Sequence, residues 1–253
     1  MEPPRSRLQT AAVQLPSSPD PTPQPRRPSP WRGVTLSGLI AAAAAGAGVA
    51  VGPRLVELMD PPDAYEQVAE EMGTRLLELP GFDERFGDIE DAEELFEAGV
   101  EIGNSAIGRL PDTQLVEWSE LMGTVLEVAD EATCADLARG TATAAQSDVF
   151  RSLDIETFRR YANMAFEMAR LELADAPRRA PPTAAESEAA WLALAERLGI
   201  DRAQEIGVTF TQPATASDAE VCAALRDLFD GINQLEGPVR VHILRDVGET
   251  LAA

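Results

Sequence analysis

The stretch GVTLSGLIAAAAAGAGVAVG, residues 33–52, carries no charge and separates two parts of different composition. As an α-helix at about 1.5 Å per residue it is roughly 30 Å long, which matches the hydrocarbon thickness of a bilayer. Trp31 and Arg32 precede the stretch and Pro53 and Arg54 follow it, in positions where interfacial anchors are typical. The sequence therefore predicts one alanine- and glycine-rich transmembrane helix over 33–52.

A cleaved export signal is an alternative interpretation of the same stretch. Arg26 and Arg27 form a twin-arginine pair before a weakly hydrophobic segment, and small residues around Ala45 and Ala47 would suit a cleavage site. Pro28 follows the arginine pair, however, where such signals usually carry a bulky apolar residue. A third interpretation is a buried helix of a soluble protein. The first two interpretations both place the C-terminal part outside the cytoplasm.

The preceding segment, residues 1–32, has nine prolines in its first thirty positions and few large apolar side chains. Such a segment cannot bury enough apolar surface to offset the entropy of ordering, so it predicts a disordered, proline-rich tail. The tail has five arginines against two acids, and arginine-rich flanks of a membrane span stay in the cytoplasm. We therefore expect a protein of the cytoplasmic membrane, with its N-terminus inside the cell.

The remainder is strongly acidic. After a linker over 53–59, residues 60–253 contain 40 acidic residues against 15 arginines, and the whole chain has no lysine. A surface of that sign repels phosphate backbones and anionic lipid headgroups. This composition argues against binding to nucleic acid and predicts a domain that stands away from the membrane surface.

Helical periodicity of apolar residues runs through the acidic part, with few β-branched runs. Stop signals recur at regular intervals, and two segments have capping-box spacing, Thr183 with Glu186 and Ser217 with Glu220. We predict an all-α fold with a single domain of seven or eight helices over 60–253. The expected helices cover 61–78, 84–107, 112–126, 130–137 and 154–176, with further starts near 183, 217 and 238.

Cys134 and Cys222 are the two cysteines, and both fall near the starts of expected helices. An oxidising compartment would allow a disulfide between them, and the long intervening loop would make it stabilising. Two buried, unrelated thiols are an alternative, because free cysteine packs as a small hydrophobe. Thiolates tuned for redox chemistry are a third interpretation, although the chain lacks C-x-x-C spacing.

Motifs for catalysis are missing from the sequence. His242 is the single histidine, which leaves a Ser-His-Asp triad or a zinc site with few candidate residues. Seven acids between Asp83 and Glu94 could supply oxygen ligands to calcium, but they lack the glycine and ligand spacing of an EF-hand, so we interpret them as a solvated helix face. We assign no catalytic, cofactor-binding or metal-binding residue, and no cofactor.

Gly48 and Gly52 have the G-x-x-x-G spacing that lets two membrane helices approach closely, so homodimerisation through this face is one hypothesis. The plan as a whole favours a non-enzymatic envelope protein whose exported domain, residues 60–253, binds or spaces another envelope protein. An exported hydrolase that uses carboxylates is the alternative, and a module that binds divalent cations is another. A cleft where two or three acids converge would favour the hydrolase.

Overall fold

The computed structural model describes residues 63–89, 92–141 and 149–251. This part of the chain forms ten α-helices and contains no β-strand, which confirms the all-α prediction. The helices are α2 (Ala64–Leu77), α3 (Phe82–Phe86), α4 (Ala92–Ile107), α5 (Asp112–Val128), α6 (Glu131–Arg139), α7 (Ile155–Leu173), α8 (Ala184–Leu198), α9 (Ile200–Thr211), α10 (Asp218–Asn233) and α11 (Gly237–Leu251).

The tail 1–32, the predicted span 33–52 with Gly48 and Gly52, and the linker 53–59 lie outside the described residues. Within the part that the structure describes, no helix combines the length and the apolarity needed to cross a bilayer.

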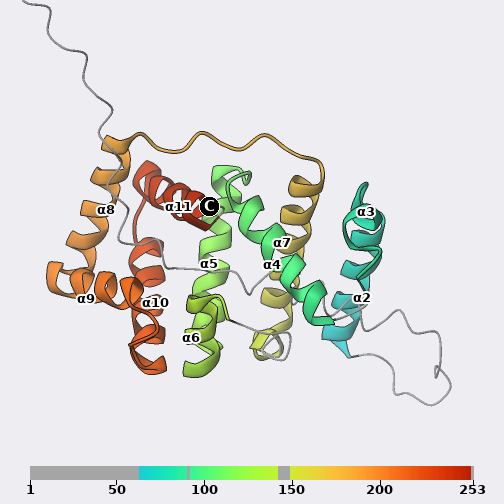
Figure 1. Ribbon diagram of the computed structural model, residues 1–253, viewed down its shortest axis with the longest axis horizontal. Helices are drawn as coiled ribbons and strands as arrows, with labels where there is room; N and C mark the ends of the chain where they lie inside the picture. The colour runs from blue at the N-terminus through green and yellow to red at the C-terminus, as the bar shows by residue number, and fades with distance from the viewer. Residues whose placement is uncertain (1–62, 90–91, 142–148, 252–253) are drawn as a thin grey trace, which may run out of the picture.

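Figure 1 shows the order of the helices across the molecule, with α8 and α9 at one end and α2 and α3 at the other. Helix α10 packs against α5, α6, α8 and α9, while α11 bridges α8, α5 and α4. Helix α7 contacts α2, α4 and α5. The two ends of the molecule are therefore joined through α4, α5 and α7.

Side-chain caps start five of these helices, α2, α6, α7, α8 and α10. A carboxylate or hydroxyl accepts hydrogen bonds from free backbone amides of the first turn, and a glutamate three residues on returns a bond to the cap. Asp130 and Asp154 cap α6 and α7, and Gly140 ends α6 with φ 69°, a left-handed conformation that glycine adopts without strain. Complete capping boxes join Thr183 with Glu186, Ser217 with Glu220, and Asp63 with Glu66.

The first described helix begins at Ala64, capped by Asp63, so the expected start at 61 was too early. The helix expected over 84–107 is two helices, because α3 ends at Phe86 and α4 begins at Ala92. At Gly87 the amide donates to the Asp83 carbonyl at 2.8 Å, and a Cβ there would lie 2.5 Å from that oxygen. Apolar periodicity alone did not reveal this break.

A second unexpected break lies at Gly199, where φ is 85° and the chain turns from α8 into α9. Residues Val208–Thr211 form the last turn of α9. These two breaks raise the count above the seven or eight helices that we predicted. Helix α5 begins at Asp112, and Pro111 occupies its cap position.

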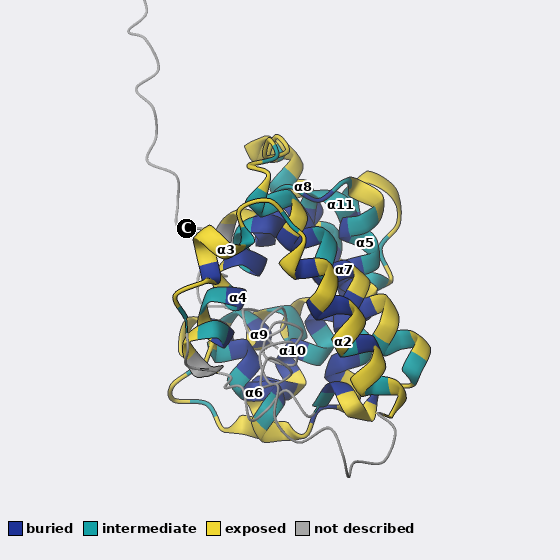
Figure 2. Ribbon diagram, turned by 90° about the vertical axis from the view of Figure 1, so that its right-hand side faces the viewer, coloured by how far each residue is buried: buried dark blue, intermediate teal, exposed yellow. Residues whose placement is uncertain are grey.

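Two hydrophobic cores lie inside, as the buried side of each helix in Figure 2 indicates. The large core contains the disulfide cysteines and gathers α5, α6 and α8 to α11, together with part of α7. The small core joins α2, α3 and α4 to the other face of α7. Its buried members are Val68, Met72, Leu76, Phe86, Ile102, Ala162 and Ala169.

Candidate functional site

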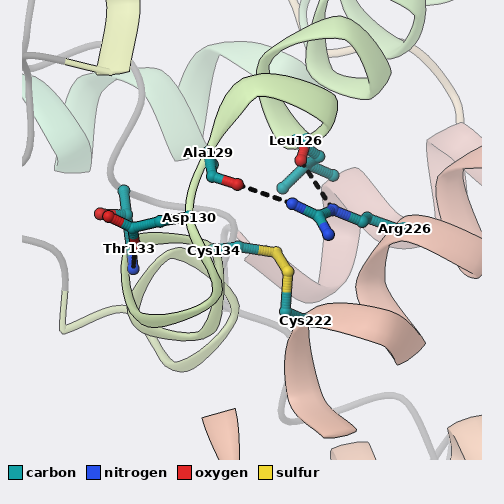
Figure 3. The surroundings of a disulfide bond; sticks show 7 residues. All are labelled: Leu126, Ala129, Asp130, Thr133, Cys134, Cys222 and Arg226. Carbon is teal, nitrogen blue, oxygen red and sulfur yellow. Dashed lines mark hydrogen bonds between the residues drawn. A yellow bond between two sulfur atoms is a disulfide. The ribbon is translucent and has the colours of Figure 1, made fainter. Parts of the chain in front are cut away.

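Cys134 of α6 and Cys222 of α10 lie at disulfide-bonding distance, with their Cα atoms 5.2 Å apart (Figure 3). This separation is within the range that a disulfide requires. Both side chains are buried, at 0% and 1% exposure. The structure thus brings together the two cysteines that the sequence singled out, and it places them where a soluble thiol reagent has no access in the folded state.

Two arginines contact residues on either side of the cysteine pair, and their contacts show how α6 and α10 run relative to each other. Arg139, at the end of α6, donates to the Asp218 carboxylate at 2.6 Å at the start of α10. Farther along α10, Arg226 donates to the carbonyls of Leu126 and Ala129, which precede α6 (Figure 3). Helices α6 and α10 therefore run antiparallel, with the cysteine pair between the two arginine contacts.

The geometry of the cysteine pair suits a role in stability and does not suit redox catalysis. A redox-active thiolate needs partial exposure and a positive environment, but these two sulfur atoms are enclosed by the large core. A bond between residues 88 positions apart would restrict the unfolded chain and, in the chain-entropy model, stabilise the fold by about 4–5 kcal/mol.

Arginines also reach main-chain carbonyls at the ends of other helices. The last carbonyls of a helix have no partner within it, and the negative end of the helix dipole favours a cation there. Arg245 donates to the carbonyls of Gly108 and Leu110 after α4, and also to the Asp112 carboxylate at 2.7 Å. Arg109 reaches the Ala176 carbonyl after α7. These contacts could not be predicted from sequence, because each joins residues that are distant in the chain.

Arg240 of α11 forms a polar network with residues of α5 and α10. It donates to the Asn233 side-chain oxygen at 2.7 Å and to the Ser119 hydroxyl at 2.8 Å, and it pairs with Glu120 at 3.2 Å. Among the described residues, Arg240 and Arg245 are the buried charged side chains, at 8% and 5% exposure, and no carboxylate is buried. Some positive charge is therefore withdrawn into the core while the negative charge stays at the surface.

A shallow hollow of about 610 Å³ lies between α3, α4 and the end of α7, and Glu84, Glu101 and Glu172 line it. Glu101 pairs with Arg85 at 3.0 Å. Glu172 pairs with Arg109 at 2.7 Å and also accepts a hydrogen bond from Ser105. Three acids do meet here, but two are held by arginines, so the hollow resembles a set of surface ion pairs more than a prepared acid–base pair.

The remaining candidates do not assemble into a site. Asp83, Glu84, Asp88 and Glu94 are exposed, and within the described ranges no three acids, histidines or cysteines are grouped as metal ligands. His242 is half-buried on α11, near Glu186. The Tyr161 phenol is buried against Phe150, and burial raises its pKa well above the usual value. That phenol belongs to the packing of the large core.

Comparison of the chain with protein-family models, with curated proteins and with solved structures finds no match, so the geometry above is the basis for the function.

Proposed function

We propose that this chain is a single-pass membrane protein whose acidic helical domain lies outside the cytoplasmic membrane and binds another protein of the envelope. The predicted span over 33–52 would attach the domain to the membrane, and the cysteine pair is compatible with an oxidising compartment. The partner would present basic groups to the domain.

One observation carries this proposal, namely the separation of charge between the interior and the surface. The chain has a net charge of −22, and none of its described carboxylates is buried. Meanwhile arginines such as Arg226 and Arg245 are occupied by backbone carbonyls inside the fold. The outer surface is therefore acidic over much of its area, which steers basic partners toward it and repels anionic ones.

Carbodiimide crosslinking in intact cells tests the proposal, because this reagent couples a carboxylate to an amine without a spacer. The chain has no lysine, so its own carboxylates have only the N-terminal amine as an internal or self-association target. Nearly every crosslink from the domain must therefore lead to a different protein. We expect crosslinks from residues 60–253 to lysines of one envelope protein. A crosslink pattern spread evenly over abundant proteins would contradict the proposal.

The hollow supports a second candidate, an exported hydrolase, because three glutamates line it. Glu84→Gln and Glu101→Gln distinguish the two functions. If the domain is a binding module, both variants should keep the crosslinks to the partner, and the cellular activity that depends on this protein should stay unchanged. Loss of that activity with intact crosslinks would favour the hydrolase.

A further inference from the structure

Helices α8 and α9 form an elbow at one end of the molecule (Figure 1), and we call residues 184–211 the α8–α9 elbow. Five large apolar side chains are exposed among the described residues, and three of them, Leu192, Ile200 and Val208, lie on this elbow. Their exposed fractions are 59%, 64% and 62%. Leu192 lies on α8, and Ile200 and Val208 lie on α9, the helix that follows it directly. Exposed apolar side chains that gather on neighbouring elements, unlike scattered ones, indicate a contact surface.

Helix geometry places these side chains away from the core. On α9, Ile200, Gln204 and Val208 are spaced four residues apart and so lie on one side, while the buried side carries Ile206 and Phe210. On α8, Leu192 points opposite to the buried Ala190 and Leu194. The apolar groups on the outer side are therefore not part of either core.

Polar contacts behind the elbow hold its backbone in place. The Trp191 indole donates to Asp246 of α11 at 2.6 Å, and Arg202 donates to Asp227 of α10 at 2.6 Å. Arg197 donates to the Gln234 side chain at 2.7 Å. A surface fixed in this way loses little conformational entropy when a partner binds.

The charges around the apolar groups define the partner's chemistry. The elbow contains five carboxylates and two arginines. Glu188 and Glu196 lie one turn before and one turn after Leu192 on the same exposed side of α8. Asp201 and Glu205 occupy exposed positions on α9. An occupant with apolar side chains flanked by lysine or arginine would satisfy both features, as amphipathic helices do.

We propose that the α8–α9 elbow is the docking surface for a basic amphipathic helix of the partner protein. A second copy of this chain would bring the same carboxylates into contact with one another, and an anionic membrane would be repelled by them. This inference rests on the proposed function and specifies which surface of the domain carries it.

The test uses the full chain and a synthetic amphipathic peptide of leucine and lysine, coupled with carbodiimide and mapped by mass spectrometry. We expect crosslinks at Glu188, Glu196, Asp201 and Glu205 in preference to the acids of α2 to α4. Leu192→Ser with Val208→Ser should lower these crosslinks by about tenfold. Leu77→Ser is the matched control, because Leu77 is 56% exposed on α2, and it should leave the map unchanged.

Three results would overturn the docking surface: crosslinks spread over all acids, an unchanged map in the Leu192/Val208 variant, or equal binding of a leucine–glutamate peptide detected by competition. Self-association that the same variant abolishes would assign the surface to a second copy instead. If crosslinks in cells reach a partner but arise elsewhere on the domain, the proposed function stands and the elbow fails. If the peptide selects the elbow while cells give no partner, the proposed function fails.

Discussion

The large core and the small core are held together by different means. In the large core, a cysteine pair joins α6 to α10, and buried arginines tie α11 to residues more than a hundred positions earlier. In the small core, α2 lies on α7 through Val68, Met72 and Leu76. We therefore expect the large core to be more stable than the small core, because the long-range covalent and buried charged links lie in the large core.

Surface contacts support α2 only modestly. Arg75 stacks on the Phe166 ring at 3.9 Å and donates to Asn163, and the Tyr65 hydroxyl donates to the Leu153 carbonyl at 2.7 Å. The exposed Arg75 contacts contribute less than about 1 kcal/mol each, and the half-buried Tyr65 hydrogen bond contributes about 1 kcal/mol. We therefore expect the α2 end to open at a lower free energy than the rest of the domain.

Removing the cysteine pair should have the largest effect on this contrast. Cys134→Ala with Cys222→Ala is expected to lower the free energy of unfolding by about 3–5 kcal/mol, since the unfolded chain regains its freedom. Urea denaturation followed by circular dichroism measures the loss. Reduced wild-type protein is the control and should fall by a similar amount. An unchanged midpoint would show that the large core does not depend on the bond.

Shortening a side chain of the small core should act locally. Met72→Ala removes a residue that is 3% exposed and should cost about 2–3 kcal/mol through lost contacts and a cavity. Hydrogen exchange should accelerate in α2 and leave α6 and α10 unaffected. Leu77→Ala, on the same helix but exposed, should change exchange little. Equal acceleration in every helix would remove the distinction between the two cores.

Disrupting the Arg240 network tests the charged links. Arg240→Met removes the donor to the Ser119 hydroxyl and leaves the Asn233 side-chain oxygen with the Ser119 hydroxyl as its remaining donor, which should cost about 2 kcal/mol in unfolding free energy. Arg160→Met is the matched control, because the pair of Arg160 with Glu117 is exposed and should contribute under about 1 kcal/mol. If both variants lose the same unfolding free energy, burial does not make the Arg240 contacts more stabilising than the exposed Arg160 pair.

The smallest effect concerns pH. The Thr157 hydroxyl and backbone amides donate to the Asp154 carboxylate and hold its pKa below the usual value, at the start of α7 between the two cores. A lowered pKa in the folded state gives stability that is complete above the unfolded-state pKa, about 3.9, and is lost as the pH falls through the folded value. Asp154→Asn removes this titrating group, so the melting temperature of the variant should fall less than that of the wild type as the pH drops below about 4.

Thr157→Val serves as the comparison, because it removes the hydroxyl donor and should bring the Asp154 pKa back toward its usual value. An acid transition identical in all three proteins would exclude Asp154 as a contributor.

The features that the sequence predicted are those that depend on neighbours in the chain. The capping boxes of Thr183 with Glu186 and of Ser217 with Glu220 are local, and both were placed correctly. The pairing of Cys134 with Cys222 was among the alternatives because the chain offered a single pair.

Features that depend on tertiary contacts could not be predicted. The apolar period continued across Gly87, so the break between α3 and α4 was missed. The burial of Arg240 and Arg245 depends on the positions of α5 and of the segment after α4, whose carbonyls and side chains they contact. The exposed apolar side chains of α8 and α9 were unrecognisable for the same reason, since exposure depends on which faces find a neighbour.

The state of the two thiols in intact cells tests the proposed location most directly. Cells are treated with an alkylating reagent without reductant, the protein is then denatured in the same reagent, and peptides that contain Cys134 and Cys222 are identified by mass spectrometry. A disulfide-linked pair of unmodified cysteines is the predicted result for a domain outside the cytoplasmic membrane. Alkylation of both cysteines would contradict that location and the envelope function built on it.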